Sequence, residues 1–186
     1  GGASAASGVY KGQGNDTMDG GSGLDLIVET ADTDFDLGDS QLDGGMVNGV
    51  DSLTSIELAR LTGGVSDNVI DGSDFSGFAT LNGAAADDTL IAAAGGSILN
   101  GNDGADSLTG SAVSDTISGG SGNDTATGAD GDDIITGGDG DDLLNGGLGS
   151  DTVSGESGAD RILGSSITDY GNVAVAGLAT PHGPTN

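Results

Sequence analysis

Aspartate recurs every nine residues between Gly101 and Gly164, and this spacing is the feature of the chain that could do chemistry. Cut at Gly101, the stretch reads GNDGADSLT, GSAVSDTIS, GGSGNDTAT, GADGDDIIT, GGDGDDLLN, GGLGSDTVS and GESGADRIL. The sixth place of every unit is Asp, and the eighth place is apolar. A short fixed period is typical of a solenoid, in which each unit buries its apolar residue by stacking on its neighbours.

Each unit predicts one turn and one short strand. Glycine fills the first place of all seven units, where the backbone must turn tightly. The last three places form a minimal strand whose middle side chain points inward. Two units therefore make one coil, and the Asp residues fall into two columns: Asp106, Asp124, Asp142 and Asp160 on one side, and Asp115, Asp133 and Asp151 on the other.

Such columns require cations. Carboxylates stacked at the strand spacing, about 4.8 Å, repel one another unless ions lie between the rungs. The chain offers hard oxygen ligands, no Cys and a single His, which favours Ca²⁺ over zinc or copper. A metal-free Gly/Asp-rich polar coil is the alternative, but it leaves the in-register Asp residues unexplained.

The units resemble the RTX family of calcium-binding nonapeptide repeats, whose pattern is GGxGxD followed by any residue, an apolar residue and any residue. GGSGNDTAT, GGDGDDLLN and GGLGSDTVS fit this pattern closely. The resemblance implies an all-β, right-handed parallel β-roll or β-helix solenoid. It also implies that each Ca²⁺ lies between same-side turns, held by Asp carboxylates and turn carbonyls.

Carried onto this chain, the resemblance implies five ion sites. They lie between Asp106 and Asp124, Asp124 and Asp142, Asp142 and Asp160, Asp115 and Asp133, and Asp133 and Asp151. The implied carbonyl donors are Gly119, Ser121, Gly128, Asp130, Gly137, Asp139, Gly146 and Leu148.

Four further ligand positions are less regular. Asp88 lies on the same side as Asp106 and completes a sixth site. The unit of Asp115 carries Ser111 and Val113 where Gly is expected, so its site has the weakest support in the array. Asp16 and Asp25 hold the sixth place of two early units, KGQGNDTMD and GGSGLDLIV, but without a well-formed same-side neighbour we expect weaker binding there.

Composition limits the functions that the chain can have. Thirty acidic residues against three basic ones give a net charge of −27, which opposes binding to nucleic acid or to anionic membranes. Few aromatic residues and 39 Gly predict a thin core that bound metal must stabilise. Extracellular calcium modules bind at about 10⁻⁴–10⁻³ M, so such sites would be empty in the cytosol and we expect a secreted or cell-surface protein. The chain begins at Gly1 and shows neither a signal peptide nor a transmembrane run, which predicts a processed form or an excised part.

The period divides the chain into four sections. Residues 1–28 hold a degenerate first rung and the two early units, and residues 29–62 lose the period. In this second section, Phe35 and Leu37 alternate with acids as in a half-buried strand; Ile56, Leu58 and Leu61 favour inward strand positions over a short helix. We interpret it as β-helix with longer, non-calcium turns. Residues 63–164 return to the nonapeptide frame after a slip of two residues, with calcium ligands mainly at 83–164, and residues 165–186 form a capping strand and tail.

Catalytic chemistries fit poorly. The single His182 lies between Pro181 and Gly183, and the DGDD segments lack the Glu and flanking helices of an EF-hand. A β-helical glycosidase or lyase lacks basic residues for an acidic polysaccharide, and no regular Thr ladder suggests ice binding.

The sequence therefore predicts a non-enzymatic structural protein that self-assembles through the solenoid ends into an extracellular filament or layer. It has no nucleic-acid partner, no membrane insertion and no small-molecule substrate. The alternative is a calcium-dependent folding and secretion module of a larger RTX toxin, adhesin or exported enzyme.

Overall fold

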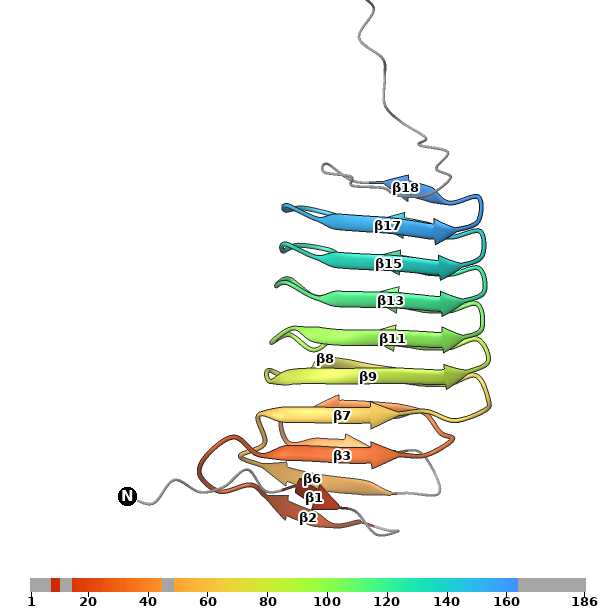
Figure 1. Ribbon diagram of the computed structural model, residues 1–186. Helices are drawn as coiled ribbons and strands as arrows, with labels where there is room; N and C mark the ends of the chain where they lie inside the picture. The colour runs from red at the N-terminus through yellow and green to blue at the C-terminus, as the bar shows by residue number, and fades with distance from the viewer. Residues whose placement is uncertain (1–7, 11–14, 45–48, 164–186) are drawn as a thin grey trace, which may run out of the picture.

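The computed structural model describes residues 8–10, 15–44 and 49–163, and every regular element in these ranges is a β-strand. The strands stack into a rod of successive coils, with two sheets facing each other across a narrow core (Figure 1). The predicted parallel β-solenoid is therefore confirmed. No helix in the described ranges is long and apolar enough to cross a membrane.

From β7 (Leu58–Thr62) onward, successive strands alternate between the two sheets. The first sheet has eight strands, in the order β1 (Gly8–Tyr10), β3 (Leu26–Thr30), β7 (Leu58–Thr62), β9 (Phe78–Ala85), β11 (Ser97–Asp103), β13 (Thr116–Ser121), β15 (Ile134–Asp139) and β17 (Thr152–Ser157). The second has ten, in the order β18 (Arg161–Leu163), β16 (Leu143–Asn145), β14 (Thr125–Thr127), β12 (Ser107–Thr109), β10 (Thr89–Ile91), β8 (Val69–Asp74), β4 (Phe35–Gly38), β5 (Gln41–Asp43), β6 (Val50–Thr54) and β2 (Thr17–Asp19).

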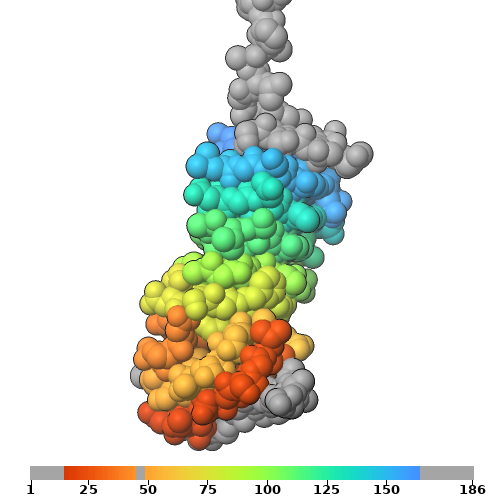
Figure 2. Space-filling model, turned by 90° about the vertical axis from the view of Figure 1, so that its left-hand side faces the viewer, coloured from red at the N-terminus to blue at the C-terminus, as the bar shows by residue number. Residues whose placement is uncertain are grey.

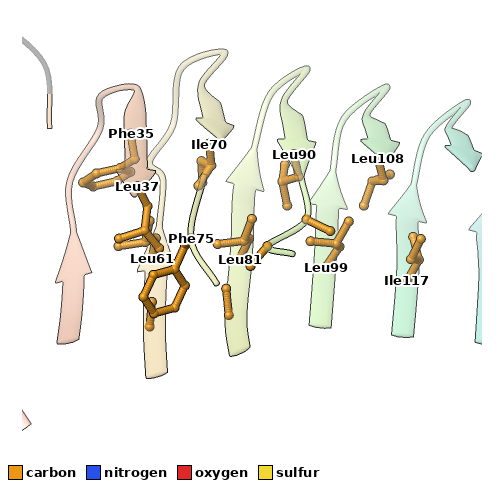
Figure 3. Close-up of a cluster of buried hydrophobic side chains, with 14 of the residues drawn as sticks. Phe35, Leu37, Leu61, Ile70, Phe75, Leu81, Leu90, Leu99, Leu108 and Ile117 are labelled. Carbon is orange, nitrogen blue, oxygen red and sulfur yellow. The ribbon is translucent and has the colours of Figure 1, made fainter. Parts of the chain in front are cut away.

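Within the repeats, the eighth-place side chains form the core. Ile117 pairs in register with Ile135 in the first sheet, and Leu108 pairs with Ala126 in the second. All four are buried. Figure 3 shows the two rows facing each other, with Leu90 and Leu108 opposite Leu99 and Ile117. Burying one such aliphatic side chain contributes about 1.5–3 kcal/mol, so a core of only two facing rows depends on the neighbouring coils and on the turns.

The section 29–62 departs from the expected β-helix with longer turns because it adds an antiparallel strand. Strand β5 pairs antiparallel with both β4 and β6, and β6 then pairs parallel with β2. Phe35, Leu37 and Leu42 are fully buried there, as the alternation of β4 predicted for the first two. The section that holds these residues lies toward the red-to-orange end of the rod (Figure 2).

One inward assignment in this section was wrong. Strand β7 buries Ala59 and Leu61, whereas Leu58 is half-buried because it lies on the outer face of the strand. Ile56 is buried as expected, but in the turn before β7.

After residue 62 the nine-residue frame returns, as predicted. The inward residues Ile70, Leu81, Leu90 and Leu99 are all fully buried. At the two-residue slip the chain turns after β8, with the Phe75 N–H donating to the Gly72 carbonyl, and the Phe75 ring fills the core. The expected capping strand and tail at 165–186 lie outside the described residues.

Candidate metal centre

The predicted Asp columns line the two long edges of the solenoid. Each sixth-place Asp immediately precedes a strand, so the backbone of the strand fixes where its carboxylate lies. Asp88, Asp106, Asp124, Asp142 and Asp160 precede β10, β12, β14, β16 and β18, and we call them the long column. Asp115, Asp133 and Asp151 precede β13, β15 and β17, and form the short column. All eight are buried.

Within each column, one carboxylate oxygen ties neighbouring coils together. The backbone N–H of Asp106 donates to Oδ1 of Asp124 at 2.8 Å, and the N–H of Asp124 donates to Oδ1 of Asp142 at 2.8 Å. The Asp88 N–H donates to Asp106 in the same way, so Asp88 belongs to the long column as expected. The Asp115 N–H likewise donates to Asp133, and the Asp133 N–H to Asp151.

The second carboxylate oxygen is the candidate metal ligand. In seven of the columns' eight Asp residues, Oδ2 is buried and accepts no hydrogen bond within the described part of the chain; these residues are Asp88, Asp106, Asp124, Asp133, Asp142, Asp151 and Asp160. Leaving a buried carboxylate oxygen unpaired is costly unless a cation supplies the missing interaction. The orphaned oxygens therefore fit Ca²⁺, the hard cation that carboxylates and carbonyls bind.

First-place glycines make room for this oxygen. A Cβ on Gly119 would collide with Oδ2 of Asp124 and lie 2.6 Å from the carbonyl oxygen of Gly137 in the next coil. A Cβ on Gly128 would likewise meet Oδ2 of Asp133 and, at 2.5 Å, the Gly146 carbonyl. Each first-place glycine thus leaves a small cradle that a carboxylate and a carbonyl oxygen share.

The expected carbonyl donors divide into two kinds. Gly119, Gly137 and Gly146 present their carbonyls to the cradle of a neighbouring coil, and Gly128 presents its carbonyl to Gly110. The third-place carbonyls of Ser121, Asp139 and Leu148 instead accept backbone N–H bonds from the preceding coil, which leaves one lone pair for an ion. Asp130, also at the third place, forms a parallel bridge with Leu148.

No three carboxylate or imidazole side chains converge on one point in the ranges that the structure describes. An ion between two stacked Asp residues would take the rest of its ligands from backbone carbonyls, as the resemblance implies, or from water.

Burial raises the pKa of five column carboxylates. Burial is the main cause for Asp106, Asp133 and Asp142, whose pKa rises to about 6, with the neighbouring column carboxylates adding to the effect. The pKa of Asp88 and Asp124 is raised by burial as well. Carboxylates that are costly to ionise in this environment gain stability from a bound cation.

Asp115 differs from the rest of its column. Its Oδ2 accepts the backbone N–H of Ser111 at 2.6 Å and the Ser111 hydroxyl at 3.0 Å. The departure of this unit from the nonapeptide pattern therefore has a direct structural counterpart.

The two early ligand positions have neighbours that the sequence analysis did not foresee. The N–H of Asp16, whose side chain is exposed, donates to Oδ1 of Asp51 at 2.8 Å. The N–H of the buried Asp25 donates to Oε2 of Glu57 at 3.0 Å. Each position therefore has a neighbouring carboxylate from the irregular section, which folds back beside it, and weaker calcium binding there stays a prediction.

Asp51 is a column-like residue that the periodic pattern missed. It is fully buried, but it lies inside β6 as the second residue of that strand, whereas the column Asp residues immediately precede theirs. Its local sequence, DSLT at 51–54, is identical to DSLT at 106–109, so a search for the last four places of the repeat would have found it.

A second ladder, at the fifth place, also escaped the sequence analysis. Oδ1 of Asn123 accepts the Asp141 N–H at 2.9 Å, and Oδ1 of Asp141 accepts the Ala159 N–H at 2.9 Å. These exposed hydrogen bonds link the turns of successive coils beside the long column.

Paired sheets closed by carboxylate-lined glycine turns define a calcium-binding β-roll. The RTX calcium-binding nonapeptide repeat matches residues 12–28, 82–117, 109–144, 118–153 and 136–166, together more than half of the chain. The chain belongs to this family, its repeats bind Ca²⁺, and the β-roll that they form is a structural calcium-binding domain. No match was found among curated proteins.

Proposed function

We propose that the protein is an exported, non-enzymatic structural protein that calcium folds into a rod and that assembles head to tail into an extracellular filament or layer. The observation that carries the proposal is that both ends of the described solenoid present open strands with the same spacing. Strands β1 and β2 begin nine residues apart, at Gly8 and Thr17, and β17 and β18 begin nine residues apart, at Thr152 and Arg161.

These four strands are the edges of the two sheets. In the described residues, β1 and β17 end the first sheet, and β2 and β18 end the second. A second copy that places its β1 and β2 on β17 and β18 would continue both sheets in parallel. Open strand edges add further strands readily, and a head-to-tail contact that does not close gives a filament.

Charge supports a calcium-rich setting for this assembly. Two bare chains, each carrying a net charge of −27, repel one another, and every bound Ca²⁺ removes two negative charges. RTX repeats are typical of exported proteins that bind extracellular calcium, which is consistent with sites of about 10⁻⁴–10⁻³ M affinity.

Sedimentation of the full chain with and without millimolar Ca²⁺ tests the proposal. We expect β-structure and large particles to appear together. The Ser52 N–H donates to the Asp16 carbonyl, so the N–H of Thr17 points to the free edge of β2. Thr17→Pro should therefore block assembly while preserving the fold, and Thr17→Val, which keeps the N–H, should assemble normally.

A chain that gains β-structure with calcium but stays monomeric at high concentration would refute assembly. It would favour a calcium-dependent folding and secretion module of a larger exported protein.

A further inference from the structure

The turns of the two columns, together with those of Asn68 and Ser97, fall into two structural classes. Seven of the eight column turns leave the Asp Oδ2 buried without a hydrogen bond in the described part of the chain. In three others the sixth-place side chain accepts the N–H of the second-place residue of its own turn. We call these the open and the closed turns.

The three closed turns share one hydrogen bond despite different side chains. Asn68 accepts the Gly64 N–H at 2.8 Å, Ser97 accepts the Ala93 N–H at 2.9 Å, and Asp115 accepts the Ser111 N–H at 2.6 Å. Asn68 and Ser97 are neutral, and neither lies in a unit that fits the calcium-binding pattern.

Backbone conformation separates the same two classes. In all seven open turns, the second- and fourth-place residues have positive φ angles: Ala84 and Ala86, Asn102 and Gly104, Gly120 and Gly122, Ala129 and Gly131, Gly138 and Gly140, Gly147 and Gly149, and Glu156 and Gly158. None of the corresponding residues in the closed turns does. Ser111 and Val113 hold places where Gly is common. Residues other than Gly pay a steric cost in the left-handed region, which agrees with the absence of positive φ angles at these two positions.

The two conformations place different groups against the carboxylate. A left-handed second residue does not direct its N–H at the sixth-place side chain, so Oδ2 is left for a cation. In the turn of Asp115, the N–H and hydroxyl of Ser111 both donate to Oδ2, while Oδ1 accepts the Ser97 N–H at 2.6 Å. Both oxygens of this carboxylate are therefore held by protein donors.

We propose that Ser111 takes the place of calcium in this turn, so that no ion lies between Asp115 and Asp133. On this edge the calcium column begins at Asp133, one coil later than the periodic sequence indicates. The long column, whose Asp oxygens are open from Asp88 onward, keeps all of its sites. The inference rests on calcium binding by the array and not on assembly, because ions are counted per chain in either state.

Restoring the repeat should create the missing site. Ser111→Gly combined with Val113→Gly converts GSAVSDTIS to GGAGSDTIS, which fits the calcium-binding pattern. We expect this variant to bind one more Ca²⁺ per chain than the unaltered protein, measured by native mass spectrometry at saturating calcium. Ala112→Gly adds glycine at the exposed third place of the same turn and should leave the count unchanged.

Two results would overturn the proposal. One is a double variant that folds normally by circular dichroism yet binds no additional ion. The other, which does not depend on how the variant folds, is calcium anomalous scattering between Asp115 and Asp133 in crystals of the unaltered protein. Absence of that peak beside peaks along the long column supports the closed turn.

Discussion

In each open turn, aspartate supplies the carboxylate oxygens and the first-place glycine leaves the space for one of them. Aspartate is short enough for Oδ1 to stay on the N–H of the preceding coil while Oδ2 lies over the first-place glycine, as Asp124 does over Gly119. Each carboxylate between two others in a column can serve an ion on either side. A residue inside the column and a residue at its end should therefore contribute unequally to calcium binding.

Asp124→Asn should remove more bound calcium than Asp160→Asn. Asp124 lies between Asp106 and Asp142, whereas Asp160 has only Asp142 as a column neighbour among the described residues. We expect losses of about two ions and one ion per chain, measured by native mass spectrometry, since each site needs both carboxylates. Asp103→Asn is the control, because Asp103 is exposed and is not among the predicted ligands. Equal losses in the first two variants would contradict shared sites.

Without calcium, the fold should become more stable as pH falls. Burial raises the pKa of Asp106, Asp133 and Asp142 to about 6, above the ordinary value of 3.8. The folded state then binds protons more tightly than the unfolded chain, so this stabilisation is full below the unfolded pKa and is lost as pH rises through about 6. Circular dichroism of the calcium-free chain should show more β-structure at pH 5 than at pH 8.

Calcium should reverse that pH dependence. Protons and Ca²⁺ compete for the same oxygens, so the apparent calcium affinity should fall below about pH 6. A calcium-free β-signal that is flat or that falls between pH 8 and pH 5 would contradict the raised pKa values. Asp142→Asn, which cannot ionise, should weaken the calcium-free trend.

At the scale of the element, a turn tolerates no side chain in its cradle. Gly119→Ala would drive a methyl group into Oδ2 of Asp124 and the Gly137 carbonyl. Overpacking of this kind costs about 1–3 kcal/mol, and here it would also displace a metal ligand. We expect a lower free energy of urea unfolding in calcium and weaker calcium binding.

Gly38→Ala provides the control for this substitution. Its Cβ would meet only Asp74 atoms, the nearest at 3.5 Å, in ordinary contact, so its stability should stay close to that of the unaltered protein. Equal destabilisation of the two variants would mean that the cradle does not set the cost of a side chain at residue 119.

Strand β15 offers two adjacent isoleucines with opposite environments. Ile135 is 1% exposed and lies in the core row, whereas Ile134 is 53% exposed on the outer face. Ile135→Ala should lower the free energy of unfolding in calcium by about 2–5 kcal/mol, because a core of only two facing rows has few side chains that could refill the cavity. Ile134→Ala should change it by less than about 0.5 kcal/mol. Similar changes in the free energy of unfolding for the two variants, measured by calorimetry, would contradict the assignment of Ile135 to the core.

The parts of the fold that could be predicted are those in which each residue has one stable role. The nine-residue period requires the eighth place to face inward and the sixth to line an edge, and Leu108 and Asp106 do so. Between residues 29 and 62 no such repetition restricts the chain, and the antiparallel β5 depends on tertiary pairing with β4 and β6. Leu58 and Ala59 show the consequence: both are apolar, and only the register of β7 decides which one is buried.

The candidate site, too, could be predicted only where the nine-residue period holds. Sequence alone placed the column Asp residues, because a ligand recurring with the coil must stack on itself. It could not foresee Asp51 beside Asp16 or Glu57 beside Asp25, because both neighbours come from the section that breaks the period. The departure at Ser111 was visible in the sequence, but its hydrogen bonds to Asp115 were not.

At the scale of the whole molecule, repulsion among the negative charges destabilises the folded state until cations bind. The net charge is −27, and the folded rod holds buried carboxylates along both edges. A cation could relieve this repulsion in two ways. It could screen the charge of the whole chain, or it could occupy the spaces between turns as a ligand-bound ion. Only the second depends on the size and geometry of the ion.

Calcium should therefore fold the chain at concentrations at which other salts do not. At about 1 M NaCl the Debye length is about 3 Å, so surface charges are well screened, yet the buried Oδ2 atoms still lack a ligand. Magnesium carries the same charge but demands near-octahedral geometry at about 2.0–2.1 Å and gives up its water reluctantly, which suits turn carbonyls poorly. We expect millimolar Ca²⁺ to induce β-structure by circular dichroism and to contract the chain by small-angle scattering, with equimolar Mg²⁺ and NaCl each giving little. If NaCl matched calcium, screening would explain folding and the columns would not be ion sites; if Mg²⁺ matched it, the turns would bind divalent charge without selecting for size.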